Sequence, residues 1–94
     1  MDKSFTDKHK KIYYIVREEL NKIDPLGVIK CNENLIDEYD METKIIIPLI
    51  NNYSDYKEFA KKICEIMSLA TGEQLQPDNY YTCAKNILEK SKNL

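Results

Sequence analysis

Residues 24–40, DPLGVIKCNENLIDEYD, form the one long segment of this chain without a helical stripe of apolar residues. Helix-like sequence lies on both sides of the segment. Its beginning matches a type I turn, because Asp24 stands at the first position, Pro25 at the second and Gly27 at the fourth. Proline also disfavours the right-handed helical conformation in the residue before it. We therefore expect the preceding helix to end near Ile23.

The end of the segment has the features of a helix start. The Asp37 side chain is placed to accept hydrogen bonds from backbone N–H groups two or three residues further on, as an N-cap does. Glu38 and Asp40 follow in the first turn, where the helix dipole favours negative charge. Ile36 and Met41 have the spacing of a hydrophobic staple around such a cap. Together these signals predict a helix that begins at Glu38.

Two motifs in this segment, DPLGV at residues 24–28 and DEYD at residues 37–40, are followed by two amphipathic segments. This combination resembles the YugE-like family of small bacterial proteins, which is classed as a domain of unknown function. The resemblance extends over nearly the whole chain and implies an α-helical single domain without an assigned activity. Helical proteins with acid-rich caps also occur in some toxin-immunity families, so an immunity-type role stays open.

Length and composition indicate an ordinary globular protein. A chain of 94 residues corresponds to one domain, residues 1–94, with a single modest core. Hydrophobic residues make up 43% of the chain and charged residues 32%, which excludes the composition of a disordered protein. The net charge is −2, so the chain has no global positive field for phosphate backbones. We therefore expect no nucleic-acid partner.

The sequence predicts a cytoplasmic bacterial protein. Residues 1–11 are polar and charged, without the apolar region of a signal peptide, and no apolar run approaches the ~20 residues of a membrane span. Cys31, Cys64 and Cys83 are odd in number and lack CxxC spacing, which is typical of a reducing compartment. The abundance of lysine, isoleucine and asparagine is typical of A+T-rich bacterial genomes.

Three segments besides the one after residue 37 have apolar residues at three- and four-residue steps, which predicts amphipathic helices. These helices span about residues 6–23, 54–71 and 78–90. The clearest stripe, in the 54–71 helix, consists of Tyr56, Phe59, Ala60, Ile63, Met67 and Ala70. We expect Ser54 to cap this helix and Gly72 to end it. We also expect Ile63 and Met67 to be deeply buried.

The helix after the 24–40 segment is expected to span about residues 38–51. Its apolar stripe consists of Met41, Ile45, Ile46, Leu49 and Ile50. The three consecutive isoleucines at 45–47 also suit a strand, and Pro48 suits neither a straight helix nor a central strand. The capped start at Asp37 favours a helix that is kinked near Pro48. All four segments together predict an all-α fold, a small single-domain bundle of about four helices.

The sequence offers few groups for catalysis. His9 is the only histidine, and with Cys64 or Cys83 it could form a thiol–imidazole dyad. Both cysteines fall on predicted apolar faces, where a free cysteine packs as a small hydrophobic residue. Gly27 and Gly72 are the only glycines, so a Gly-rich phosphate loop is absent. We therefore predict a protein that is not an enzyme and has no cofactor.

Acidic residues concentrate between residues 33 and 42, and this concentration is the candidate binding site. Its members are Glu33, Asp37, Glu38, Tyr39, Asp40 and Glu42. Their spacing is not that of a calcium loop, and carboxylates at a helix start are explained by capping, so we predict no metal site. A basic protein partner fits such a surface, and tyrosine is enriched in binding hot spots.

The leading functional hypothesis is a non-enzymatic protein-interaction module, immunity-type or regulatory, that binds a basic partner through this acidic surface. We expect no membrane partner, and we expect the protein to be a monomer or a homodimer. The alternative is a small ligand- or metal-binding protein or an enzyme that uses His9, a cysteine or the acidic cluster. The lack of catalytic groups favours the first hypothesis.

Overall fold

Helices account for the regular structure of the described residues. The computed structural model describes residues 3–25, 27 and 38–94, and these residues contain four α-helices, two 3₁₀-helices and no strand. The elements are α1 Lys3–Ile23, α3 Asp40–Ile46, η2 Ile47–Asn52, α4 Tyr56–Thr71, η3 Pro77–Tyr80 and α5 Tyr81–Lys92. The predicted all-α bundle is confirmed. None of these helices has the length and hydropathy needed to cross a membrane.

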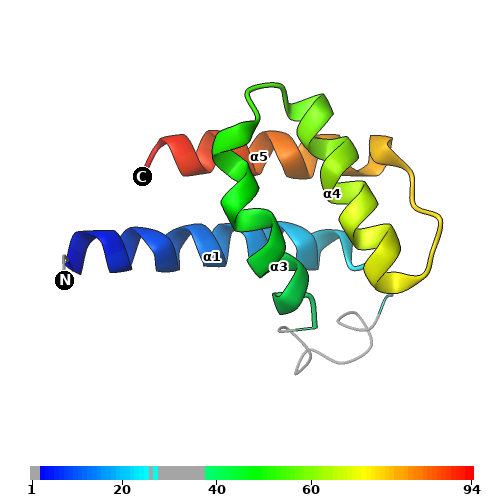
Figure 1. Cartoon of the computed structure of the whole chain (residues 1–94), viewed down its shortest axis with the longest axis horizontal. Helices are drawn as coiled ribbons and strands as arrows, with labels where there is room; N and C mark the ends of the chain where they lie inside the picture. The colour runs from blue at the N-terminus through cyan, green and yellow to red at the C-terminus, as the bar shows by residue number, and fades with distance from the viewer. Residues whose placement is uncertain (1–2, 26, 28–37) are drawn as a thin grey trace.

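The helices form two layers (Figure 1). α1 and α5 pack together and run in opposite directions, so the start of α1 and the end of α5 lie at the same end of the molecule. α3 with η2, and α4 after a short connection, cross over this pair. The molecule measures 39 × 32 × 18 Å, and its short dimension corresponds to two helices of about 10 Å diameter.

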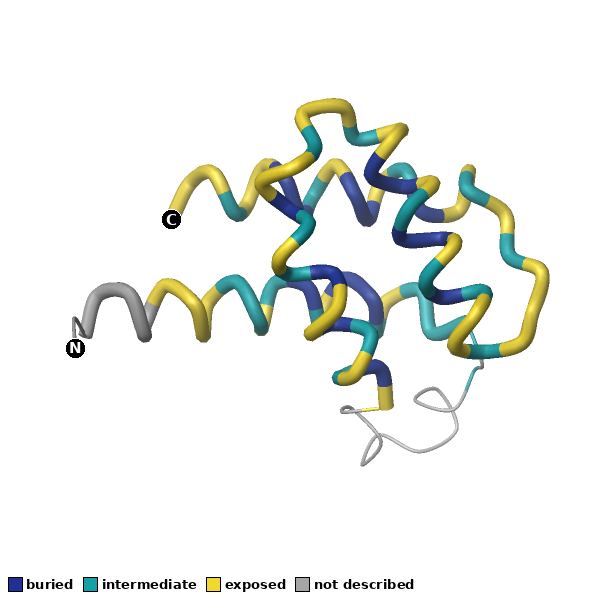
Figure 2. Tube along the Cα trace, in the orientation of Figure 1, coloured by how far each residue is buried: buried dark blue, intermediate teal, exposed yellow. Residues whose placement is uncertain are grey.

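One hydrophobic core lies between the layers, and its buried positions face inward along the helices in Figure 2. α1 contributes Val16 and Leu20. The buried hydrophobic residues of α4 and α5 are Phe59, Ala60, Ile63, Cys64, Met67, Cys83, Ala84, Ile87 and Leu88. The predicted burial of Ile63 and Met67 is therefore confirmed, as is the packing of Cys64 and Cys83 in the core. Cys31 lies outside the described residues.

The turn after α1 forms where the sequence places it. α1 ends at Ile23, and the backbone N–H of Gly27 donates to the carbonyl of Asp24 over 2.8 Å, as in a four-residue turn. Asp24 has a φ of 44°, in the left-handed region. Pro25 disfavours the right-handed conformation at this position, and aspartate tolerates the left-handed one better than most residues. This local chemistry explains why the helix ends at Ile23.

The second predicted helix is divided into two elements. The expected start at Glu38 is wrong, because α3 begins at Asp40 and Tyr39 occupies its N-cap position without a side-chain capping bond. The predicted cap and staple residue, Asp37 and Ile36, lie outside the described residues. After Ile46 the chain winds more tightly as η2, and Pro48, the second residue of this 3₁₀-helix, cannot supply an N–H to continue the hydrogen bonds of α3.

The buried face of α3 differs from the predicted stripe. The residues that face the core are Tyr39, Thr43, Ile46 and Ile50. Met41 is 73% exposed and Ile45 is 50% exposed, so the prediction for these two residues is wrong. Thr43 can face the core because its hydroxyl donates to the carbonyl of Tyr39 over 2.9 Å. The apolar pattern missed this face because two of its residues carry hydroxyl groups.

α4 is capped at both ends. The carboxylate of Asp55 accepts a hydrogen bond from the backbone N–H of Lys57 over 2.9 Å, and the helix begins at the residue after Asp55. The prediction of Ser54 as the cap is therefore wrong by one position. Gly72 ends the helix in the left-handed conformation with a φ of 73°, as predicted for a glycine in this place.

Replacing Asp55 with alanine is expected to destabilise the protein by about 0.5–2 kcal/mol, because α4 loses its N-cap. Asp55→Asn keeps an acceptor and should cost little. Ser54→Ala is the matched control, one residue earlier, and should change stability by less than about 0.5 kcal/mol. Urea denaturation measures all three variants. If Ser54→Ala cost as much as Asp55→Ala, the assignment of the cap would have to be revised.

The last helix begins with a tight turn. η3 spans Pro77–Tyr80, and α5 continues to Lys92, two residues beyond the predicted end at residue 90. Tyr80 is buried, whereas the ring of its neighbour Tyr81 meets the ring of Tyr56 edge-on, with centroids 6.2 Å apart. This aromatic pair connects α5 to α4.

A buried carboxylate connects α1 to α5. Glu19 is 2% exposed, and it accepts hydrogen bonds from Asn86 Nδ2 over 3.1 Å, from Lys90 Nζ over 2.9 Å and from Lys22 Nζ over 3.1 Å. Burial by itself raises the pKa of the Glu19 carboxyl, but the hydrogen bonds from Lys90, Asn86 and Lys22 together lower this pKa below its usual value. The carboxylate therefore stays charged at neutral pH. Nothing in the pattern of α1 marks Glu19 as buried.

Candidate functional site

The structure describes four of the six residues of the predicted acidic site. Glu33 and Asp37 lie outside the described residues. The other four, at the start of α3, are Glu38, Tyr39, Asp40 and Glu42. These four side chains have different surroundings, and they do not form one continuous exposed surface.

Tyr39 belongs to the core and not to an exposed surface. Its ring is almost fully buried, and its hydroxyl donates to the carboxylate of Asp24 over 2.7 Å. The bond connects the start of α3 to the turn after α1. The prediction of Tyr39 as a binding residue gains no support from this geometry, because its ring packs in the core while its hydroxyl finds a partner in that turn.

Asp40 and Glu42 are partly covered. Asp40 forms an ion pair with Arg17 of α1, with 3.2 Å between Oδ1 and Nε, and this pair connects α3 to α1. Glu42 is half-buried, and its Oε2 is covered without a hydrogen-bond partner among the described residues. Glu38 is exposed. Within the described residues, Glu38 and Glu42 are therefore the charges of the predicted site best placed for a partner.

One side of α3 combines these two carboxylates with exposed apolar residues. This surface, the α3 outer face, consists of Glu38, Met41, Glu42 and Ile45. Within α3, steps of three and four residues place Met41, Glu42 and Ile45 on one side of the helix, and Glu38 lies in the turn just before it. Met41 and Ile45 stand one turn apart, and both belong to the few large hydrophobic residues exposed in the described part of the chain. The sequence identified the carboxylates but assigned the two apolar residues to the core.

The dyad of His9 with a cysteine does not form among the described residues. His9 is exposed on α1, whereas Cys64 and Cys83 are buried in the core. Burial, and to a lesser degree the charge of Glu19, raises the pKa of the Cys83 thiol to about 12. This thiol is therefore protonated at neutral pH, and the thiolate is the reactive form of cysteine. The structure gives the dyad no support.

No group of three or more His, Cys, Asp or Glu side chains is arranged to hold a metal ion in the described ranges of the chain. The described acidic residues of the 33–42 stretch do not converge, because Asp40 turns to Arg17 while Glu38 remains in solvent. The geometry of the described residues therefore adds nothing to the metal-binding alternative.

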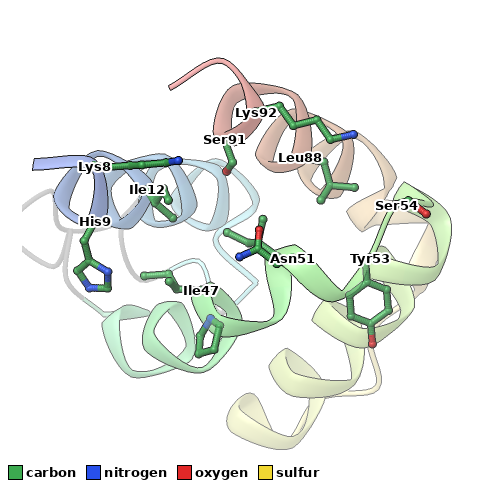
Figure 3. A pocket seen from close by; sticks show the side chains of 12 residues that line it. Lys8, His9, Ile12, Ile47, Asn51, Tyr53, Ser54, Leu88, Ser91 and Lys92 are labelled. Atoms are coloured by element: carbon green, nitrogen blue, oxygen red, sulfur yellow. The ribbon is translucent and has the colours of Figure 1, made fainter. Parts of the chain in front are cut away.

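A second surface is hollow, and the sequence did not predict it. A groove of about 700 Å³, the α1–α5 groove, lies between the first half of α1, η2 and the end of α5 (Figure 3). Its apolar lining includes Ile12 from α1, Ile47 and Ile50 from η2, and Leu88 from α5. Small-molecule sites in proteins commonly have volumes of about 300–1,000 Å³, so the groove is large enough for a ligand.

Among the described side chains, basic groups line the α1–α5 groove, and no Asp or Glu does. The basic groups are Lys8 and His9 from α1 and Lys92 from α5. The chain as a whole has a net charge of −2, so this positive region is local. In the sequence, Lys8 and Lys92 lie near opposite ends of the chain. Only the antiparallel packing of α1 and α5 brings them to one groove.

No protein-family model, curated protein or solved structure matches this chain. The resemblance of residues 24–28 and 37–40 to the YugE-like family therefore stays a prediction from two short motifs. Two surfaces of the described residues are candidates for binding a partner or ligand: the α3 outer face and the α1–α5 groove.

Proposed function

We propose that this protein is a non-enzymatic protein-interaction module of the bacterial cytoplasm, immunity-type or regulatory, that binds a basic partner through the α3 outer face. The observation that carries the proposal is the exposure of Met41 and Ile45 beside Glu38 and Glu42. Exposed apolar residues grouped on one face and bordered by charged residues are typical of interaction sites. The burial of both described cysteines supports a non-enzymatic role.

The chemistry of the face defines its partner. Met41 offers a flexible apolar side chain, which adapts to different partner surfaces. Glu38 and Glu42 favour a partner with lysine or arginine around an apolar centre, and the charges would steer association more than they add to affinity. Glu33 and Asp37, the other predicted members of the acidic stretch, lie outside the described residues.

Replacing Met41 with serine is expected to reduce capture of the partner about tenfold or more, because truncating a binding hot spot costs at least ~1–2 kcal/mol. Glu42→Lys should also reduce capture and weaken its dependence on salt. Tagged protein is used as bait in a native bacterial lysate at low and moderate salt. Met41 is 73% exposed, so Met41→Ser should leave the melting temperature nearly unchanged.

Matched controls separate the face from general effects of charge and hydrophobicity. Leu69 on α4 is 80% exposed, so Leu69→Ser removes a similar apolar side chain elsewhere. Glu73→Lys reverses an exposed charge in the loop after α4. Both control variants should capture the partner as the unchanged protein does. Capture that survives Met41→Ser and Glu42→Lys, or the recovery of no reproducible partner at either salt concentration, would contradict the proposal. Recovery of a second copy of this chain would make the face a homodimer contact.

A further inference from the structure

The α1–α5 groove is formed by α1, η2 and α5, whereas the α3 outer face belongs to α3 and the turn before it. The groove is lined by basic side chains, and the α3 outer face carries carboxylates. We propose that this groove is a binding site for an anionic amphiphile, a small molecule with a carboxylate group on an aliphatic body. The inference is independent of the proposed protein partner. It rests on the apolar lining, the basic side chains and the polar groups of the groove.

The apolar lining suits an aliphatic chain. Ile12, Ile47 and Leu88 come from three different elements, and each offers branched hydrocarbon surface to the groove. Ile12 and Ile47 are partly exposed residues packed against the core, so their outer surfaces remain open to a ligand. Burial of an aliphatic chain against such residues is driven by the hydrophobic effect and increases with each methylene group.

The basic side chains define the charge of the ligand. Lys8 and Lys92 come from the two helices that form opposite sides of the groove, and Figure 3 shows Lys8 extending from α1 and Lys92 lying above Leu88 on α5. His9 adds a third basic group. A cationic head group would find no carboxylate among the described side chains of the lining, whereas an anionic one has two ammonium groups within the same groove.

Polar groups in the groove provide further hydrogen bonds. Asn51 from η2 and Ser91 from α5 lie between the two helices in Figure 3. The Ser91 hydroxyl is covered and has no hydrogen-bond partner among the described residues. Because the oxygen of this hydroxyl is covered, the exposed Asn51 is the polar group of the two that an entering carboxylate can reach.

Three ligands with a ten-carbon chain test the inference on the full-length protein: sodium decanoate, decanol and decyltrimethylammonium. The two ionic ligands are used below their critical micelle concentrations and decanol below its solubility limit. Isothermal titration calorimetry measures binding. We expect decanoate to bind saturably at one site, and decanol and the cation to bind at least about tenfold more weakly. Decanoate should also bind about fourfold more tightly than nonanoate for its one additional buried methylene.

Two pairs of variants locate the site. Lys8→Gln combined with Lys92→Gln should weaken decanoate binding about tenfold or more, because both ammonium groups are removed. Lys10→Gln combined with Lys85→Gln removes two exposed lysines from the same helices outside the groove, and should leave binding unchanged. All four lysines are exposed, so the melting temperatures of the two double variants should be similar.

Nuclear magnetic resonance of the methyl groups shows where on the protein the ligand binds. The Ile12, Ile47 and Leu88 resonances should shift on addition of decanoate, and those of Ile45 on the α3 outer face should not. Equal binding of decanol or of the cation would overturn the proposal, as would equal losses in the two double variants. Absence of saturable decanoate binding would overturn it too, and would leave the proposed protein partner of the α3 outer face unaffected.

Discussion

Truncating Met67 or Ile63 to alanine is expected to lower the free energy of unfolding by about 2–5 kcal/mol. Both side chains are fully buried, and they stand four residues apart on the inner face of α4. Each truncation removes apolar surface from the core and leaves a cavity that the packed neighbours fill only in part. A small domain has a total stability of about 5–15 kcal/mol, so either variant loses a large part of it.

The measurement is urea denaturation followed by circular dichroism, with Leu69→Ala as the matched control. Leu69 lies two residues beyond Met67 on the same helix and is 80% exposed. Its truncation should change stability by less than about 0.5 kcal/mol, the usual scale for surface substitutions. A similarly small effect for Met67→Ala and Ile63→Ala would show that the inner and outer faces of α4 have been assigned incorrectly.

Replacing Glu19 with alanine is expected to lower the free energy of unfolding by about 2–3 kcal/mol, the scale of a strong hydrogen bond to a charged group. Glu19 is buried and accepts hydrogen bonds from Lys22, Asn86 and Lys90, two of which lie on α5. The variant loses all of these bonds, although the two half-exposed lysines can turn to water. Glu18→Ala, at the exposed neighbouring position, is the matched control and should have little effect.

Acid should remove the contribution of Glu19 to the free energy of unfolding. Its folded-state pKa is lowered below the usual 4.5 by the three hydrogen-bond donors, which outweigh the opposing effect of burial. The stabilisation is therefore fully present above the unfolded-state pKa and is lost as the pH falls through the folded-state value. The difference in stability between the unchanged protein and Glu19→Gln should be constant near neutral pH and shrink below about pH 4.5. A difference that grows on acidification would contradict this account.

The candidate surfaces depend on which residues the folded chain leaves exposed. The sequence predicted an exposed Tyr39 and a buried Met41. In the structure Tyr39 packs in the core and Met41 faces solvent. The α3 outer face therefore combines predicted carboxylates with apolar residues that only the structure places beside them. The α1–α5 groove was not predictable, because Lys8 and Lys92 are 84 residues apart in the chain.

The sequence by itself determined the features that depend on local chemistry. The helix end at Ile23 follows from the Asp24–Pro25 step, and the end of α4 follows from the freedom of Gly72 to adopt a positive φ. The inner face of α4 was predictable because its stripe is apolar without interruption. The all-α class followed from the same periodicity in four segments.

Only the tertiary structure decided which groups meet across helices. The buried position of Glu19 depends on Asn86 and Lys90 from α5, and the buried ring of Tyr39 depends on Asp24 as partner for its hydroxyl. A polar side chain can be buried wherever a distant residue satisfies its hydrogen bonds, and apolar periodicity contains no information about that residue. For the same reason, the sequence could indicate the helices but not the groove that they enclose.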